Sequence, residues 1–268
     1  MQALHIGILN IMHDKEATSQ RFHRVLSTPE QPVVIHEYYP RQHYAGRPVP
    51  DSVARLMQPL DLSAVAQLDG FIVTGAPIET IPFAQITYIQ ELRDLMETLV
   101  SHRIPQLYLC WGAMAALNHF YGITKHRLPH KLFGVYPHQI LQETPLLAGL
   151  TPGFVAPHAR YAEMDADQLA ATPDLRVDAV TTAGDLFLVE NGHQRQTFMF
   201  AHLEYDRWAL VHEYRRELLA HPERTYHPAE NDFEPTTMAV PPFAWQTSQH
   251  RFFTNWLAQV AQWRAVQV

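Results

Sequence analysis

Short, nearly continuous apolar segments alternate along the first half of the chain with segments whose apolar residues recur at helical spacing. Apolar runs of this kind are typical of strands buried on both faces of a parallel sheet. Strands are predicted over residues 4–12, 31–39, 68–77 and 104–110, and helices over 15–26, 87–102 and 111–122. Because strands and helices alternate, the pattern predicts an α/β fold with a mostly parallel sheet and helices on both faces.

The second half of the chain has a more mixed pattern. It predicts further strands within 133–141, 175–191 and 196–206, several of them antiparallel, and helices over 209–221 and 252–263. Residues 40–50 contain proline and glycine among polar positions and are expected to form a loop. No internal repeat, low-complexity tract or shift in composition marks a linker, so residues 1–268 are interpreted as a single domain.

Charge and cysteine content exclude several classes of protein. The formal net charge is −7 and the basic residues form no stripe, which argues against a nucleic-acid partner. A single cysteine rules out an intramolecular disulfide and zinc sites of the Cys₄ or Cys₂His₂ kind, and it fits a reducing compartment. The apolar N-terminal run lacks a basic start and a cleavage site, and no stretch approaches a membrane span. A cytoplasmic location without membrane attachment is therefore expected.

That one cysteine, Cys110, lies where a predicted strand runs directly into a predicted helix. A residue at this junction is exposed at the ligand-binding edge of a parallel sheet. The free N–H groups and partial positive charge at the start of the helix lower a thiol pKa and can stabilise an oxyanion. The position therefore indicates a nucleophile, although a small buried hydrophobic residue is the commoner fate of a free cysteine.

A thiolate nucleophile needs a base and a group that orients the base. Among 17 histidines, His202 stands out because it ends the apolar segment 196–201 and Glu204 follows it. If the strand continues, residues i and i+2 share a face, so the carboxylate can flank the imidazole. The alternative is a surface histidine beside a solvated glutamate. The sequence has no H-E-x-x-H, G-x-G-x-x-G or Walker motif, so no metal, dinucleotide or P-loop site is expected.

Several motifs, in order and over nearly the whole chain, resemble the MetA-type homoserine O-acyltransferases, which have a class I glutamine-amidotransferase-like (flavodoxin-like) fold. The motifs are LNIMHDKEAT, LDGFIVTGAPIETIPF, YLCWGAMAALNHFYGI, KLFGVYPH, FVAPHARY, HLEYD, EYRREL and FFTNWL. The resemblance implies ping-pong chemistry, in which an acyl-CoA acylates Cys110 and a hydroxy amino acid then removes the acyl group. His202 would be the proton acceptor and Glu204 would hold it in place.

The resemblance also implies which residues bind the amino-acid substrate. Lys131 and Arg216 match the family's substrate-binding positions, and a planar guanidinium suits a carboxylate. Glu213 lies one helical turn before Arg216 and is expected to orient its guanidinium. Without the resemblance, both cations would be interpreted as solvated surface charges.

The choice of acyl donor is associated in this family with one position, where glycine accompanies succinyl-CoA and glutamate accompanies acetyl-CoA. This chain has Glu79 there. Its carboxylate would repel the free carboxylate of a succinyl group and fill its space, so acetyl-CoA is the expected donor. The alternative is that Glu79 is an ordinary loop residue.

The choice of acceptor is less determined. The family's usual P-H-S-R has Ala159 in place of serine, and Leu203 replaces the proline of the usual H-P-E. Both departures are expected near the acceptor pocket, with Ala159 as the specificity residue. They favour L-serine and cysteine biosynthesis. L-homoserine and methionine biosynthesis stay open, because one methylene is worth only about 1–3 kcal/mol of discrimination.

Two rival functions share some of these features. A class I glutamine amidotransferase uses the same Cys…His-x-Glu arrangement, but KLFGVYPH and FVAPHARY argue against it. A non-catalytic binding protein would be expected to have lost Cys110, His202 or Glu204. The preferred interpretation needs no cofactor or metal, with acetyl-CoA as co-substrate. The sequence leaves the oligomeric state open, with a homodimer as one candidate.

Overall fold

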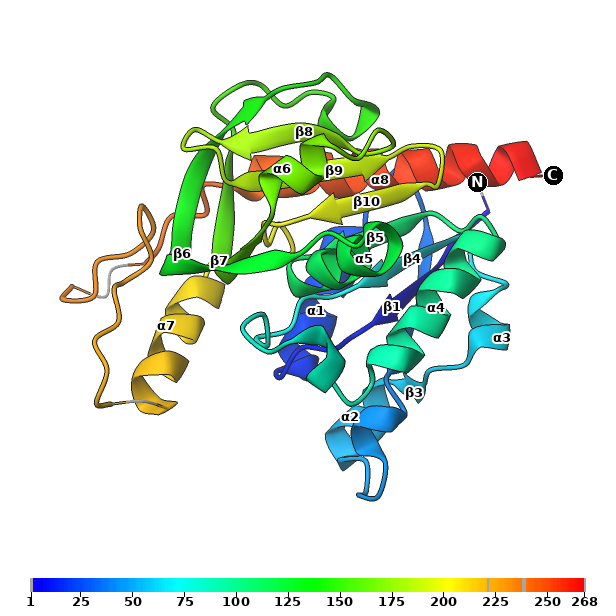
Figure 1. Ribbon diagram of the computed structural model, residues 1–268, viewed down its shortest axis with the longest axis horizontal. Coiled ribbons are helices and arrows are strands. Elements are labelled where there is room, and N and C mark those ends of the chain that lie inside the picture. Colours follow the sequence, from blue (N-terminus) through cyan, green and yellow to red (C-terminus); the bar gives the residue numbers. More distant parts are fainter. Residues whose placement is uncertain (1, 221, 238–239, 268) are drawn as a thin grey trace.

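The computed structural model describes residues 2–220, 222–237 and 240–267, and its centre is a ten-stranded sheet (Figure 1). The strand order is β3-β2-β1-β4-β5-β10-β9-β8-β6-β7. The first six strands in this order run parallel. Their bounds are β3 Gln58–Pro59, β2 Val33–Tyr39, β1 Leu4–Leu9, β4 Gly70–Val73, β5 Gln106–Leu109 and β10 Gln196–Met199.

The remaining strands extend the sheet as an antiparallel segment beyond β10. They are β6 Lys125–Ile140, β7 Val155–Met164, β8 Arg176–Thr181 and β9 Leu186–Asn191. The chain leaves the parallel part after α5, forms β6 to β9, and returns as β10 beside β5. Segments distant in the sequence therefore meet at the centre of the sheet.

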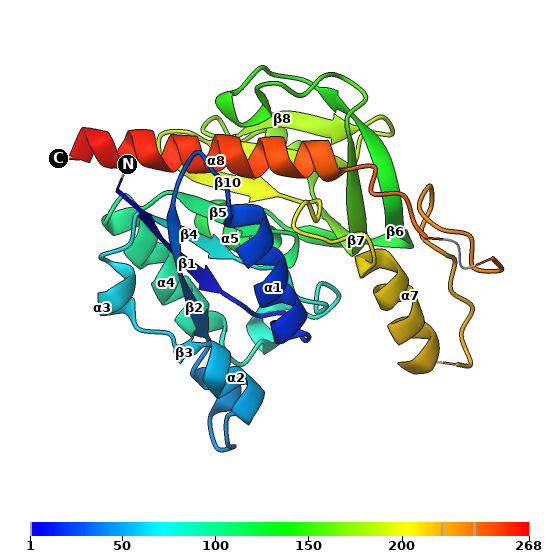
Figure 2. The same cartoon turned by 180° about the vertical axis from the view of Figure 1, so that it is seen from behind.

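Helices cover both faces of the parallel part. α1 (Lys15–Leu26) and α8 (Gln246–Gln267) cover one face, which is in front in Figure 2, and α4 (Ile89–Ser101) and α5 (Trp111–Tyr121) cover the other. The other helical segments are α2 Asp51–Leu56, α3 Leu62–Val65, α6 Ala166–Ala170, α7 Ala209–Ala220, and three short 3₁₀ turns at Gln42–Tyr44, Phe83–Gln85 and Pro145–Leu147. None of the helices in the described ranges combines the length and apolar character needed to cross a membrane.

The central strands of the parallel part supply side chains to two separate cores. On β5, Leu107 and Leu109 pack into the cluster under α1 and α8, whereas Tyr108 between them packs into the cluster under α4 and α5. Successive side chains of a strand point to opposite faces, so a strand with helices on both sides must be apolar throughout. This explains why the parallel strands are nearly continuous apolar runs.

The predicted fold class is confirmed, and several elements match closely. The first helix spans 15–26 as predicted, and α5 ends at Gly122, which has the left-handed conformation typical of a helix C-cap. Two predicted boundaries are wrong, and one strand was missed. The strand expected over 196–206 ends at Met199, the last helix begins at Gln246, and residues 155–164 form a strand that the pattern did not predict. His221, the end of the predicted helix 209–221, lies outside the described residues.

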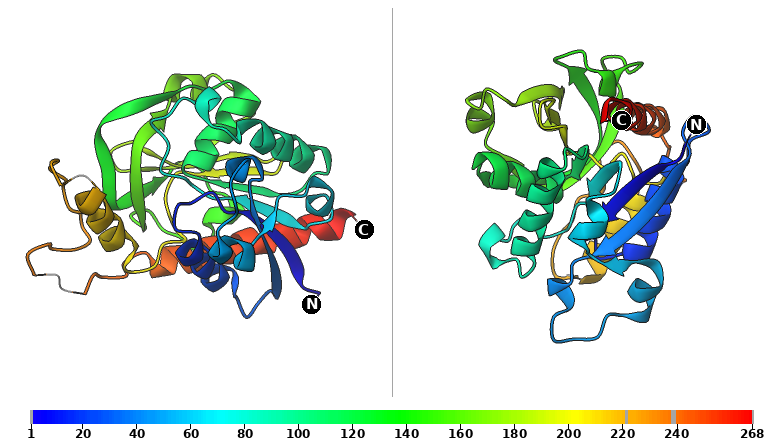
Figure 3. Two further views of the ribbon diagram at one scale, coloured as in Figure 1. Left: turned by 90° about the horizontal axis from the view of Figure 1, so that it is seen from below. Right: turned by 90° about the vertical axis from the view of Figure 1, so that its right-hand side faces the viewer.

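The fold places the ends of β5 and β10 side by side. The two strands pair in parallel, with Leu109 opposite Met199. The residues that follow them, Cys110 and Phe200, therefore leave the sheet at the same carboxyl edge, where open α/β folds bind ligands. α7 projects from this edge beside the ends of β6 and β7 (Figures 1 and 3).

Candidate active site

Cys110 forms a sharp turn between β5 and α5. It is the N-cap of α5 and has φ 46° and ψ −111°, a region that residues other than glycine seldom occupy. Its backbone N–H donates to the Met199 carbonyl at 2.7 Å, which ties the turn to the end of β10. Such strain persists only where the surrounding structure imposes it, and it is concentrated at functional sites. The turn places the thiol at the positive end of α5.

Two glycines permit the close packing around this turn. A Cβ on Gly112 would lie 2.8 Å from the Thr74 carbonyl oxygen and 3.0 Å from that of Val73, so only glycine allows α5 to begin against the end of β4. A Cβ on Gly75 would lie 3.3 Å from both Cys110 Cβ and His202 Cε1. Gly75 therefore lies in direct contact with the thiol-bearing residue and with the imidazole.

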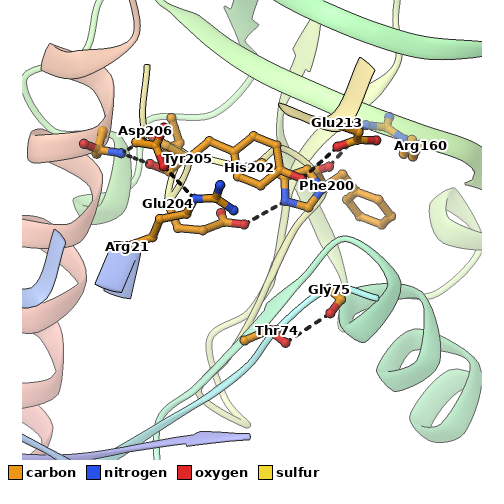
Figure 4. A network of polar contacts seen from close by, with 12 residues as sticks. Arg21, Thr74, Gly75, Arg160, Phe200, His202, Glu204, Tyr205, Asp206 and Glu213 are labelled. Atoms are coloured by element: carbon orange, nitrogen blue, oxygen red, sulfur yellow. Dashed lines mark hydrogen bonds and ion pairs between the residues drawn. The ribbon is translucent and has the colours of Figure 1, made fainter. Parts of the chain in front are cut away.

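The structure brings His202 and Glu204 together, with 2.7 Å between Nδ1 and Oε1, and both side chains are buried (Figure 4). The reason differs from the one the sequence suggested. These residues form a turn, in which the Tyr205 N–H donates to the His202 carbonyl at 3.0 Å, and they do not continue the strand. The Tyr205 ring stacks on the imidazole, with the centroids 4.4 Å apart.

The environment of His202 favours the imidazolium. Burial alone would lower its pKa, but the Glu204 carboxylate and a hydrogen bond and charge interaction with Cys110 outweigh burial and raise the pKa well above its usual range. Nδ1 faces Glu204, so Nε2 is the nitrogen free to exchange a proton. Cys110 and His202 are thus paired by a hydrogen bond, and Glu204 supports the charged form of the imidazole.

The turn that carries His202 is fixed from three sides, by residues to which the sequence analysis assigned no role. Arg21 of α1 binds Asp206 at 2.8 Å and lies over the Tyr205 ring (Figure 4). Trp245 Nε1 and Gln249 Nε2 donate to the Tyr205 carbonyl at 3.1 and 2.9 Å. A local sequence pattern could not indicate these contacts, because the three residues come from α1, from the residue before α8 and from α8 itself.

A buried polar chain supports the same segment from the opposite side. Arg160, which is fully buried, forms an ion pair with Glu163 and donates to the Phe200 carbonyl at 3.3 Å. It also donates to Nδ1 of His158, whose Nε2 lies 2.8 Å from Nε2 of His138. Burial, followed by the charge of Arg160, holds the pKa of His158 well below its usual range, so this histidine is neutral. The network fixes the backbone immediately before His202.

A cavity of about 350 Å³ opens beside Cys110 and His202. The residues proposed from the sequence as donor and acceptor contacts all line it, namely Glu79, Lys131, Ala159 and Arg216, together with Glu213. Glu79 is held by the Tyr161 N–H, which donates to its Oε1 at 3.1 Å. The sequence motifs therefore converge on one cavity, although they come from a loop, two strands and α7.

The charged residues of α7 form a cluster on one wall of this cavity. Lys131 binds Glu213 and lies 2.6 Å from Glu217 Oε1. Burial would lower the pKa of Lys131, but the two carboxylates raise it, and they keep the ammonium charged. Burial raises the pKa of Glu213, but Lys131 outweighs this and lowers it. Lys131 and Glu213 are therefore both charged at neutral pH.

The expected pairing of Glu213 with Arg216 is present only as a long ion pair, and the expectation about Leu203 is corrected. Glu213 lies 3.9 Å from Arg216, and the closer partner of that guanidinium is His13 Nε2 at 2.6 Å. Leu203 is fully buried in the core under α8 and does not line the cavity, so its replacement of proline gives no argument about the acceptor. Within the described ranges, no cluster of three or more histidine, cysteine or acidic residues is arranged to hold a metal ion.

Comparisons with known proteins give two kinds of likeness. A family model described as homoserine O-succinyltransferase matches residues 1–266. A serine O-acetyltransferase of Lacticaseibacillus casei is 51% identical, with 97% of both chains covered, and one of Lactobacillus acidophilus is 49% identical, with 95% covered. A homoserine O-acetyltransferase of Thermotoga neapolitana is 35% identical, over 96% of this chain and 84% of that protein.

Solved structures with a similar fold have little sequence identity with this chain. A glutamine amidotransferase from Thermotoga maritima has a TM-score of 0.60 at 10% identity, with 98% of both chains covered. Another, from Methylobacillus flagellatus, has a TM-score of 0.60 at 13% identity, covering 96% of this chain and 95% of the other. At these identities the likeness shows the fold alone, which is that of the class I glutamine amidotransferases.

Proposed function

The chain belongs to the homoserine O-succinyltransferase family and is an O-acyltransferase, and we propose that it transfers the acetyl group of acetyl-CoA to the hydroxyl of L-serine. L-Homoserine is the alternative acceptor. The observation that carries the proposal is the strained Cys110 at the start of α5, beside a buried His202–Glu204 pair and at the wall of a cavity. A thiol, a base and an orienting carboxylate are the parts that covalent acyl transfer needs.

In the first half-reaction, the Cys110 thiolate attacks the thioester carbonyl of acetyl-CoA. The N–H groups of the first helical turn, which begins at Trp111, have no intrahelical acceptors and are available to the developing oxyanion. The tetrahedral intermediate collapses with cleavage of the bond to the CoA sulfur, and the His202 imidazolium gives its proton to that leaving thiolate. The products are acetyl-Cys110 and free CoA.

In the second half-reaction, His202 acts as a base. Acetylation removes the negative charge of Cys110, which is one of the causes of the raised His202 pKa, so the imidazole becomes easier to deprotonate. It takes the proton of the acceptor hydroxyl as that oxygen attacks the thioester. The Cys110 thiolate leaves, which regenerates the thiolate–imidazolium pair. The acetyl group is carried by the thiol itself, so the reaction needs no cofactor.

The donor proposal rests on Glu79. Its carboxylate lines the cavity with Cys110 and is held in place by Tyr161. A succinyl group would bring a second carboxylate into the same space, and like charges in a partly buried site repel strongly. Acetyl-CoA has no such group, so Glu79 selects it by excluding the larger anionic donor.

The acceptor proposal rests on Ala159 and on the named relatives. Ala159 is a cavity residue with no hydroxyl to offer, and the two relatives near 50% identity are named serine O-acetyltransferases. Arg216 is expected to bind the acceptor carboxylate, and Lys131 contributes its remaining N–H and positive charge. L-Homoserine stays the alternative acceptor, because a more distant relative is named homoserine O-acetyltransferase.

The test is an assay of CoA release from acetyl-CoA, with L-serine and L-homoserine compared as acceptors by kcat/KM. Mass spectrometry of the protein mixed with acetyl-CoA alone is expected to find one acetyl group on residue 110, and none in Cys110→Ala. Glutamine is included as a substrate, because the fold is shared with amidotransferases. Ammonia release from glutamine without acetyl transfer would refute the proposal, as would undiminished turnover in Cys110→Ala.

A further inference from the structure

The cavity wall formed by α7 carries both an anion and a cation that face the space beside Cys110. Glu217 and Arg216 are adjacent in the sequence, and both line the cavity. The acceptor of the proposed reaction is a zwitterion at neutral pH, with an ammonium and a carboxylate on the same carbon. A site for it must supply one group of each charge.

The carboxylates in this cavity differ in how far their oxygens are already used. Glu213 binds Lys131 through Oε1 and accepts from the Tyr205 hydroxyl at Oε2, at 3.2 Å. Both oxygens of Glu213 therefore have a short-range donor. Glu79 accepts from the Tyr161 backbone N–H, and its own carbonyl accepts from Lys125. Glu213 therefore has both oxygens occupied, whereas Glu79, which the proposed function assigns to donor choice, is held through Oε1 by the backbone of β7.

Glu217 is different. Its Oε1 lies 2.6 Å from Lys131 Nζ, but within the described part of the chain its Oε2 has a single long contact, 3.4 Å from the Tyr161 hydroxyl. Its side chain is 15% exposed, and that exposure is toward the cavity it lines. A carboxylate oxygen has lone pairs for about two donors. Glu217 Oε2 therefore has accepting capacity left for a ligand in the cavity that the residue lines.

Arg216 supplies the opposite charge. Its side chain is 38% exposed, and its hydrogen-bond partner is His13, whose pKa is lowered by burial and then by Arg216 itself. A neutral imidazole does not neutralise the guanidinium, and the Glu213 carboxylate, which binds Lys131, lies 3.9 Å away, so the positive charge is available to a ligand. Lys131, in contrast, is compensated by two glutamates.

From this difference we infer that Glu217 Oε2 binds the α-ammonium of the acceptor while Arg216 binds its carboxylate, an inference that rests on the proposed function. The two contacts fix the α-carbon and direct the side-chain hydroxyl to the acetylated thiol. The site would then select α-amino acids over hydroxy acids that lack the ammonium, because the latter leave a partly buried carboxylate without its partner.

The experiment compares wild type with Glu217→Gln, which keeps the shape of the side chain and removes its charge. Binding of L-serine and of its deamino analogue 3-hydroxypropanoate is measured by calorimetry, and L-homoserine is paired with 4-hydroxybutanoate in the same way. Acetylation of Cys110 by acetyl-CoA and the melting temperature are measured in parallel. Glu97→Gln is the matched control, because Glu97 is exposed and its ion pair with His119 joins α4 to α5, outside the cavity.

The variant is expected to bind the amino acid about 10- to 100-fold more weakly, to raise its KM by a similar factor, and to leave kcat within about three-fold, since charge-paired hydrogen bonds contribute about 1.5–3 kcal/mol. The deamino analogue should bind variant and wild type equally, and Cys110 should still be acetylated. An equal loss for both ligands would mean that Glu217 only positions Lys131, and would overturn the inference. So would a wild type that binds both ligands equally. Binding selectivity without acetyl transfer would overturn the proposed function and leave this inference standing.

Discussion

Gly75→Ala tests whether the spacing between Cys110 and His202 governs the chemistry. The added methyl carbon would lie 3.3 Å from Cys110 Cβ and 3.3 Å from His202 Cε1. The φ angle of Gly75 is not among the positive values in this structure, so alanine is compatible with the backbone. The perturbation is therefore one methyl group placed between the nucleophile and its base.

The size of the expected loss in kcat/KM depends on how far the imidazole can move away from the added methyl group. Ordinary carbon contacts are about 3.5–4.0 Å, so each neighbour must retreat by a few tenths of an ångström. The imidazole cannot retreat freely, because Tyr205 stacks on it at 4.4 Å and Glu204 holds Nδ1 at 2.7 Å. A misplacement of about 1 Å costs roughly 100-fold in rate, so a few tenths of an ångström should lower kcat/KM by about 3- to 10-fold.

Stability should change much less than activity. Overpacking destabilises the fold by about 1–3 kcal/mol. Replacing glycine by alanine at a compatible site stabilises it by about 0.4–1 kcal/mol, because it lowers the conformational entropy of the unfolded chain. The melting temperature should therefore fall by no more than about 10 °C. The measurements are rapid-quench mass spectrometry of Cys110 acetylation and thermal unfolding. Gly192→Ala is the matched control, because a Cβ there would meet nothing within 4 Å. Wild-type rates of both half-reactions in Gly75→Ala would show that this spacing does not limit catalysis.

The remaining predictions concern the donor, the acceptor, the base and the buried network. Glu79→Gly should raise kcat/KM for succinyl-CoA relative to acetyl-CoA by at least about 10-fold, and an unchanged ratio would place Glu79 outside donor choice. Ala159→Ser should shift the kcat/KM ratio of L-serine to L-homoserine by about 5- to 100-fold, the range that one small pocket contact supplies; a constant ratio would remove the structural reason for preferring serine. Glu204→Gln should destabilise the fold more at pH 6.5 than at pH 9.5. The raised pKa of His202 contributes stability that is complete below its usual value of about 6.5 and is lost as pH rises through the raised value; urea unfolding at both pH values checks this, and a pH-independent loss would contradict it. Arg160→Met should cost about 3–5 kcal/mol in the same unfolding assay, because it leaves a buried carboxylate unpaired; a loss under 1 kcal/mol would show that the network is dispensable.

The elements that the sequence predicted well are those decided locally. The helix over 15–26 begins after Asp14, whose side chain accepts from the Ala17 N–H, and α5 ends where Gly122 adopts the left-handed conformation. Capping and the freedom of glycine act within a few residues, so the pattern contains the information. The pattern also predicted β1, β4 and β5, because burial on both faces makes such strands mostly apolar.

The strand β7 could not be predicted in the same way. It contains His158, Arg160 and Glu163, which indicate solvent exposure, yet all three are buried. Their polar groups are satisfied by one another and by the Leu186 and Phe200 carbonyls, which belong to other segments. Burial of charge depends on partners brought by the tertiary fold, and a local pattern cannot show them.

The arrangement of the candidate site follows from strand order more than from any motif. Cys110 and His202 are distant in the sequence, and the whole antiparallel segment β6 to β9 lies between them. They meet because the chain returns as β10 in parallel register with β5, so that both residues leave the sheet at one edge. Since that edge also carries the positive end of α5, a histidine that becomes an imidazolium there is tolerated only with a carboxylate beside it. Glu204 is supplied by the turn that follows the strand. In a strand, Glu204 would lie two residues along the same face as His202. The turn instead folds the Glu204 carboxylate back onto Nδ1 of His202 and leaves Nε2 for the thiol.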